Sequence, residues 1–304
     1  MTTKQFFGVH AALLTPRNAD GAVDAAALAR LIQFVLAKGI SKFALNGATG
    51  EFPLMRAQDL ETALETARRA SQGRAQVLCG IGGPGIAVSR ELAAVAQGAG
   101  ADGLLLPMPY FFRYEQDDLK AFCREAAKAS ELPILLYNLP QFSTSLAKET
   151  VRTLIEDVPN IVGIKDSGGS LDILRDLTRK EIEACRIVGN DPVLRPALSE
   201  AVCDGIISGI ACVLPELIVR LYEQGPRAAC KEFDDSWRPL REIARQLDSF
   251  PTPWALKWIA EARGIFDATF AQPLSDERIT RGAKLKSWFR EWFPAAIPEG
   301  TLTF

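Results

Sequence analysis

Eight short apolar runs, alternating with amphipathic helical patterns, predict an α/β fold: a (β/α)8 TIM barrel with a C-terminal helical extension. The runs are continuously apolar rather than alternating, which indicates parallel strands that are buried on both faces. No G-x-G-x-x-G follows the first run, so a doubly wound dinucleotide-binding sheet is the weaker choice. The predicted strands cover residues 7–14, 42–46, 76–81, 103–107, 133–138, 161–165, 186–189 and 205–210.

The strongest helical patterns have recognisable ends. Asp24 is the expected N-cap of the first helix, and Gly39 is the expected stop in the left-handed conformation. The side chains at helical spacing on its buried face are Leu28, Leu31, Ile32, Val35 and Leu36. A second clear pattern covers residues 116–129.

The chain changes character after about residue 225. Strand patterns stop there, and residues 227–247, 253–263 and 276–293 read as helices that hold or border all five tryptophans. No Ser/Gly-rich linker precedes them. We therefore expect residues 1–225 to form the barrel and residues 226–304 to form a helical extension packed on it.

Composition excludes several classes of function. The 304 residues are 48% hydrophobic and carry a net charge of -2, so no bulk attraction to nucleic acid or to an anionic membrane is expected. No apolar run approaches the roughly 20 residues of a membrane helix, and the first residues lack the pattern of a secretion signal. The six cysteines form no C-x-x-C pair, which favours reduced thiols in the cytoplasm.

His10 is the only histidine in the chain. A site built from several histidine ligands is therefore impossible, and a Ser-His-Asp triad would have to use this one residue. His10 lies inside the first predicted strand, where a structural role is favoured. We expect neither a metal nor a cofactor.

The fifth and sixth predicted strands end on reactive side chains. The run Ile-Val-Gly-Ile ends on Lys165, and the preceding strand ends with Tyr137 and Asn138. An amine among apolar side chains loses hydration, which favours its neutral and nucleophilic form. Because barrel enzymes take their reacting groups from the C-terminal ends of the strands, this pair predicts amine chemistry on a carbonyl.

Other strand ends offer binding groups. Residues 46–52 read Asn-Gly-Ala-Thr-Gly-Glu-Phe, and the two glycines free consecutive N–H groups to hold a carboxylate or phosphate, with the Thr49 hydroxyl as a further donor. A plain turn is an equally good interpretation of this loop. Asp191, after the seventh strand, is a candidate to bind substrate hydroxyls. Asp166 points away from Lys165 and is expected to cap the next helix.

These motifs together resemble one family. Gly-Ala-Thr-Gly-Glu at 47–51 is similar to its G-[ST]-T-G-E loop, Tyr-Asn-Leu-Pro at 137–140 to its Y-N-x-P, and Gly-Ile-Lys-Asp-Ser at 163–167 to its G-x-K-[DE]-[ST]. Residues 253–264 resemble its C-terminal helical segment. Over nearly its whole length the chain resembles the dihydrodipicolinate synthase/N-acetylneuraminate lyase family of class I pyruvate aldolases.

The resemblance implies roles for particular residues. Lys165 would form a Schiff base with the keto carbon of a 2-keto acid, and Tyr137 would shuttle the proton. The Ile207 backbone carbonyl would lie near the amine. The remaining substrate-binding positions are Ala48 and Thr49 for the carboxylate, and Gly189, Asp191 and Ser208 for hydroxyl groups.

The chain departs from both namesake enzymes. Ala48 and Phe111 stand where the synthase has its relay threonine and second tyrosine, and Phe142 stands where its carboxylate-binding arginine lies; a phenyl ring cannot form that bidentate pair. Pro192 replaces the lyase's sugar-gripping glutamate. We therefore expect reversible aldol cleavage of a 2-keto-3-deoxy sugar acid to pyruvate and an aldehyde, with the Phe111/Phe142 wall facing a short or apolar tail.

Other functions remain open at this point. The same iminium could lose the C4 hydroxyl as water, as in a dehydratase, or the chain could be a 4-hydroxy-tetrahydrodipicolinate synthase. A barrel that binds a 2-keto acid as a regulator is the non-enzymatic alternative, and a metal-dependent aldolase is disfavoured by the single histidine. The expected partners are a small 2-keto acid, an aldehyde and, by family resemblance, three further copies in a homotetramer.

Overall fold

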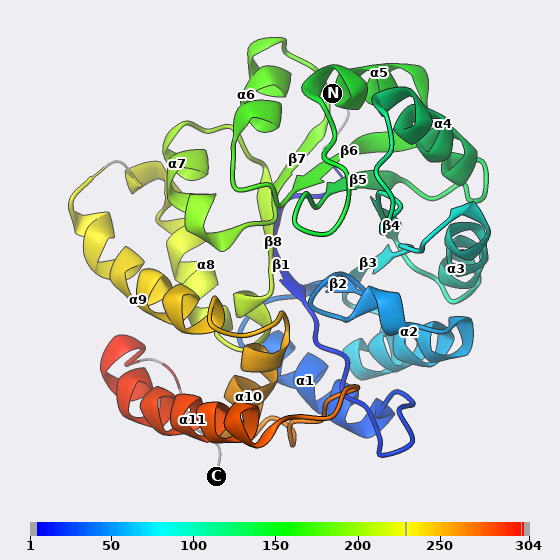
Figure 1. The fold of residues 1–304 in the computed structure, drawn as a ribbon. Coiled ribbons are helices and arrows are strands. Elements are labelled where there is room, and N and C mark those ends of the chain that lie inside the picture. The colour runs from blue at the N-terminus through cyan, green and yellow to red at the C-terminus, as the bar shows by residue number, and fades with distance from the viewer. Residues whose placement is uncertain (1–4, 229, 299, 301–304) are drawn as a thin grey trace.

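The computed structural model describes residues 5–228, 230–298 and 300, and within them eight parallel strands close into a barrel in sequence order. This confirms the predicted fold, and Figure 1 shows the ring of helices around the strands. The strands are β1 (Gly8–Ala12), β2 (Lys42–Leu45), β3 (Gln76–Gly80), β4 (Gly103–Pro107), β5 (Ile134–Asn138), β6 (Ile161–Asp166), β7 (Cys185–Val188) and β8 (Gly205–Ser208).

A helix follows each strand. These helices are α1 (Ala25–Ala37), α2 (Ala57–Ser71), α3 (Ile86–Gly98), α4 (Gln116–Ala127), α5 (Lys148–Asp157), α6 (Asp172–Arg179), α7 (Leu194–Ser199) and α8 (Pro215–Glu223). Asp24 caps α1 as predicted, because its side chain accepts from the Ala27 N–H at 2.9 Å, and Gly39 is left-handed with φ 87°. The first strand ends at Ala12 rather than Leu14, and the eighth gives way to a short 3-10 turn at Ile210–Cys212.

Side chains fill the barrel interior. Leu78, Leu105, Leu135, Ile187 and Ile207 pack against one another there, so the barrel is a core and not a pore. His10 lies fully buried on β1, where burial and the nearby Lys42 ammonium lower its pKa to about 4. Its imidazole is therefore neutral at pH 7.

The C-terminal extension lies on one side of the barrel, where Figure 1 shows it in yellow to red. It consists of α9 (Glu232–Leu247), α10 (Trp254–Ala262) and α11 (Asp276–Ala296). Within the described residues, no helix combines the length and the apolar character that crossing a membrane requires. All six cysteines are among the described residues and none forms a disulfide; four of them are buried.

A buried ion pair joins this extension to the barrel. The guanidinium of Arg263 is fully buried, donates to the Val213 carbonyl at 2.7 Å, and contacts both Glu216 oxygens at 3.0 and 3.1 Å. It also lies over the rings of Phe34 on α1 and Phe293 on α11. Burial alone would raise the pKa of Glu216, but the hydrogen bonds from Arg263 outweigh it and hold that pKa below its usual range.

Arg263→Met should destabilise the protein strongly, because it leaves the Glu216 carboxylate buried without its main partner. We expect a loss of about 3–5 kcal/mol, the typical cost of breaking a buried pair from one side. Urea unfolding measures the loss. Arg179→Met is the control, because the Arg179 side chain is 74% exposed beside Asp176 and should cost about 1 kcal/mol or less.

Candidate active site

The predicted reactive pair meets at the C-terminal ends of β5 and β6. Tyr137 and Lys165 are paired residues in the parallel register, and both are 3% exposed. The Lys165 amine lies 4.0 Å from the centre of the Tyr137 ring. Among the described residues, Lys165 forms no salt bridge, so its amine is not committed to a carboxylate.

A register shift between these strands brings the two side chains together. Ile134 pairs with Ile161, but Leu135 pairs with Gly163, so Val162 is an extra residue on β6. Without this shift, the alignment that begins with Ile134 opposite Ile161 would continue regularly and place Ile164 beside Tyr137. The bulge therefore aims Lys165 at the phenol.

On the outer face of the barrel, hydrogen bonds between polar groups connect the ends of β5 and β6. The Asn138 amide donates to the Asp166 carboxylate at 2.8 Å, and the Gly168 N–H donates to the same oxygen at 2.9 Å. The prediction that Asp166 caps the following helix is wrong, because α6 begins only at Asp172 and Asp166 closes the turn before it. Burial raises the pKa of Asp166, while these hydrogen bonds oppose the shift.

Gly189 makes room for the lysine. A Cβ at this position would overlap the Ser167 hydroxyl and lie 2.7 Å from Lys165 Cε. The Ser167 hydroxyl donates to the Gly189 carbonyl at 3.0 Å, which ties β6 to β7. Only glycine fits here, a steric requirement that the sequence motif does not reveal.

The loop after β2 presents free backbone donors. Its turn is closed by hydrogen bonds from the N–H groups of Gly50 and Phe52 to the Gly47 carbonyl and from Glu51 to the Ala48 carbonyl. The N–H groups of Ala48 and Thr49 donate to no acceptor among the described residues, and both residues line the cavity above Lys165. Such consecutive free amides suit a carboxylate.

Unpaired acceptors lie on the β7 side of the cavity. Asp191 Oδ1 and Asn190 Oδ1 are buried and have no hydrogen-bond partner among the described residues. Burial raises the pKa of Asp191 to about 6, against the opposing effects of the Ser208 hydroxyl and the Lys165 charge. Two unpaired acceptors at a cavity wall are suited to hydroxyl donors of a ligand.

The cavity that joins these groups has a volume of about 340 Å³. Of the predicted site residues, Ser208 does not line it; this residue is buried, and its hydroxyl accepts from the Ala211 N–H at 3.1 Å. The predicted residues that line the cavity are Ala48, Thr49, Tyr137, Lys165, Gly189, Asp191 and Ile207.

The extension supplies a wall that the sequence analysis missed. Ala244 and Leu247 of α9, residues 251–253 of the connecting segment, and Ala255 and Leu256 of α10 all line the cavity. Apart from Thr252, these side chains are apolar and cannot be distinguished from core positions in the sequence, so no signal could have assigned them to the site.

Aromatic side chains also border the cavity. Phe142 lines it and is 57% exposed, whereas Phe111 is 87% exposed, has φ 84°, and lies outside it. Phe111 instead borders a neighbouring cavity of about 450 Å³ that shares Ala48, Phe142 and Thr252 with the first. The predicted Phe111/Phe142 wall is thus divided between two cavities.

A buried lysine and a phenol at the mouth of a closed barrel define an enzyme of the (β/α)8 class. The model of the dihydrodipicolinate synthetase family matches residues 5–287, so the chain belongs to this family. The chain is similar to the 4-hydroxy-tetrahydrodipicolinate synthases of Chlorobium luteolum and Salinibacter ruber. It is 30% identical to the first over 90% of this chain and 93% of the relative, and 31% identical to the second over 90% and 91%.

Solved structures agree with this assignment. Dihydrodipicolinate synthase from Aquifex aeolicus superimposes with a TM-score of 0.86 at 26% identity, over 94% of this chain and 98% of that chain. The prophage protein YagE of E. coli K12, solved in complex with pyruvate, gives a TM-score of 0.85 at 26% identity over the same shares.

Asp191→Asn should change how stability depends on pH. The folded pKa of about 6 exceeds the ordinary value of 3.8, so the wild type loses stability as pH rises from about 4 to about 6 and does not regain it above. We expect the variant to be more stable than the wild type at pH 7 by about 3 kcal/mol, an advantage that is largely lost at pH 4. Urea unfolding at both pH values measures this, with Asp172→Asn on the exposed start of α6 as the control.

Proposed function

We propose that this chain is a Schiff-base-forming lyase that cleaves a 2-keto-3-deoxy sugar acid reversibly into pyruvate and an aldehyde. The observation that carries the proposal is the buried Lys165 amine, unpaired with any described carboxylate and 4.0 Å from the Tyr137 ring. The free amides of Ala48 and Thr49 lie at the same cavity and suit the carboxylate of a 2-keto acid.

The chemistry follows from these groups. The Lys165 amine, in its unprotonated form, adds to the C2 carbonyl. The adduct then loses water to leave an iminium, with the Tyr137 phenol giving its proton to the departing hydroxyl. The resulting Tyr137 phenolate accepts the proton of the C4 hydroxyl while the C3–C4 bond breaks, and the electrons of that bond pass into the iminium to form an enamine. The aldehyde leaves, C3 takes up a proton, and water releases pyruvate and the free amine. Positioned proton transfer of this kind contributes about 10²–10⁴-fold to the rate.

The distal part of the substrate would meet two kinds of surface. Asp191 and the Gly189 region offer acceptors for hydroxyl groups, which supports a sugar acid. Ile207 would present its backbone carbonyl near the amine, and Ser208 would act on Asp191 from outside the cavity lining. Phe142 borders the same cavity and suits the apolar edge of a short tail.

A second candidate is 4-hydroxy-tetrahydrodipicolinate synthase, which condenses pyruvate with aspartate semialdehyde. The names of the curated relatives favour it. Phe142 opposes it, because a phenyl ring offers no bidentate contact to a second carboxylate. Dehydration of the same iminium, and a regulator that binds a 2-keto acid without turnover, are the remaining alternatives.

The substrate class is decided by products. The purified chain is incubated with a panel of 2-keto-3-deoxy acids, and separately with pyruvate and aspartate semialdehyde. We expect pyruvate release from the sugar acids and no detectable condensation. Condensation without cleavage would establish the synthase, loss of water without pyruvate would establish the dehydratase, and Schiff-base formation without any turnover would leave the regulator.

The proposal extends to domain boundaries, assembly and cellular location. We infer that residues 1–225 are the barrel and residues 226–304 its extension, that four copies assemble, and that the protein works in the cytoplasm. The exposed Phe111 and Phe112 support an association surface, and the free cysteines support a reducing compartment. Sedimentation analysis tests the tetramer.

Borohydride added with pyruvate should reduce the iminium and leave a stable adduct on the peptide that carries Lys165. Lys165→Ala should lose both the adduct and turnover, and Tyr137→Phe should keep the adduct but lose about 10²-fold or more in turnover. Peptide mass spectrometry measures the adduct, and a pyruvate-release assay measures turnover. Lys180→Ala, at the exposed end of α6, is the control. Full activity in Lys165→Ala would exclude the mechanism.

A further inference from the structure

A second buried lysine lies close to the carboxylate-binding loop but outside the reaction. Lys257 of α10 is fully buried, and its amine lies 2.6 Å from Glu51 Oε2. Lys257 does not line the cavity above Lys165. Burial lowers the pKa of Lys257, and the Glu51 carboxylate opposes that shift. The two residues are 206 positions apart in the chain.

Glu51 controls the shape of the loop. Its backbone is left-handed, with φ 59°, a conformation that disfavours any residue other than glycine or asparagine. Its N–H donates to the Ala48 carbonyl at 3.1 Å and closes the turn whose free amides belong to Ala48 and Thr49. The direction of those two N–H groups therefore depends on a residue in an unfavourable backbone conformation, whose side chain is paired with Lys257.

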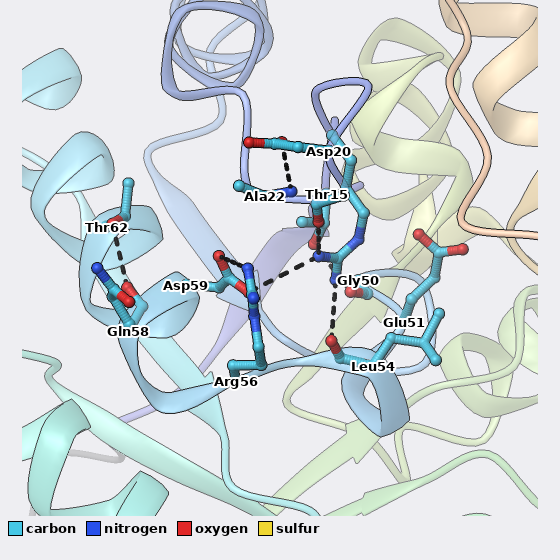
Figure 2. A network of polar contacts seen from close by, with 12 residues as sticks. Thr15, Asp20, Ala22, Gly50, Glu51, Leu54, Arg56, Gln58, Asp59 and Thr62 are labelled. Carbon is cyan, nitrogen blue, oxygen red and sulfur yellow. Dashed lines mark hydrogen bonds and ion pairs between the residues drawn. The ribbon is translucent and has the colours of Figure 1, made fainter.

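Other contacts hold the same loop from the barrel side. The Thr15 hydroxyl donates to the Gly50 carbonyl at 2.8 Å, and Arg17 donates to the Leu54 carbonyl at 3.4 Å while it faces Asp59. Figure 2 shows Thr15, Leu54 and Asp59 grouped together, with the Glu51 carboxylate directed away from that cluster. The Glu51 side chain therefore points toward the extension, where it forms an ion pair with Lys257.

The same helix also touches the site directly. Leu256, the neighbour of Lys257, lines the cavity, and its Cδ1 and the Thr49 hydroxyl both crowd the position where a Cβ of Gly209 would lie. A movement of α10 would therefore displace Thr49 through two sets of contacts: the packing of Leu256 and the ion pair between Lys257 and Glu51.

We propose that Lys257 is a positioning residue: through its ion pair with Glu51, the C-terminal extension orients the Ala48 and Thr49 amides and so sets the affinity for the substrate carboxylate. This inference rests on the proposed function, because it assumes that these amides bind a 2-keto acid. It assigns Lys257 no contact with substrate and no part in proton transfer.

The test compares a ketone that has the carboxylate with one that lacks its charge. Borohydride trapping on Lys165 is measured against pyruvate and against pyruvamide in the wild type, Lys257→Met and the double variant Lys257→Met/Glu51→Gln. The double variant removes both charges, so no unpaired buried carboxylate remains to unfold the chain. Lys286→Met is the matched control, because Lys286 pairs with Glu261 on the same α10 helix and does not reach the loop.

We expect the half-saturating concentration of pyruvate to rise at least 10-fold in Lys257→Met and in the double variant, with the limiting trapping rate and the response to pyruvamide little changed. Lys257→Arg should restore most of the affinity, and Lys286→Met should match the wild type. Wild-type affinity for pyruvate in a folded Lys257→Met or double variant would overturn the inference, as would an equal loss for both ketones. Absence of any Lys165 adduct in the wild type would instead refute the proposed function.

Discussion

The pairing of β5 with β6 is the constraint on which the site depends. It places Tyr137 beside Lys165 inside the barrel and, one residue on, Asn138 beside Asp166 outside it. Because adjacent residues on a strand face opposite sides, a slip of β6 by one position would turn Lys165 out of the barrel and place Ile164 or Asp166 opposite Tyr137. The Asn138–Asp166 hydrogen bond opposes such a slip, since it forms only in the observed alignment.

Much of this organisation could be predicted from short patterns. Continuous apolar runs predicted the strands, and the polar ends of those runs predicted where Lys165 and Tyr137 would lie. The extra residue at Val162 could not be predicted, because nothing in Ile-Val-Gly-Ile-Lys distinguishes a bulge from a regular strand. The role of Asp166 was misassigned for a related reason: a cap depends on where the helix begins, and boundaries are the least certain part of a sequence-based assignment.

Contacts between distant parts of the chain explain the rest of what was missed. Lys257 and Glu51 have ordinary neighbours in the sequence, and only the fold shows that each is the other's partner. Gly189 carries no local signal for its closeness to Lys165, because that closeness arises between two strands. The cavity itself combines unpaired acceptors near β7 with an aromatic border at Phe142, a contrast that becomes visible only when the strand ends converge.

The wall formed by α9 and α10 has a consequence for the order in which the protein is made. All eight strands lie before residue 209, so a ribosome has synthesised every strand while residues 244–257 are still to come. A nascent chain at that stage holds both reactive side chains but has an open pocket and no counter-ion for Glu51. The wall of the cavity above Lys165 is therefore complete only after the residues of α9 and α10 have been added.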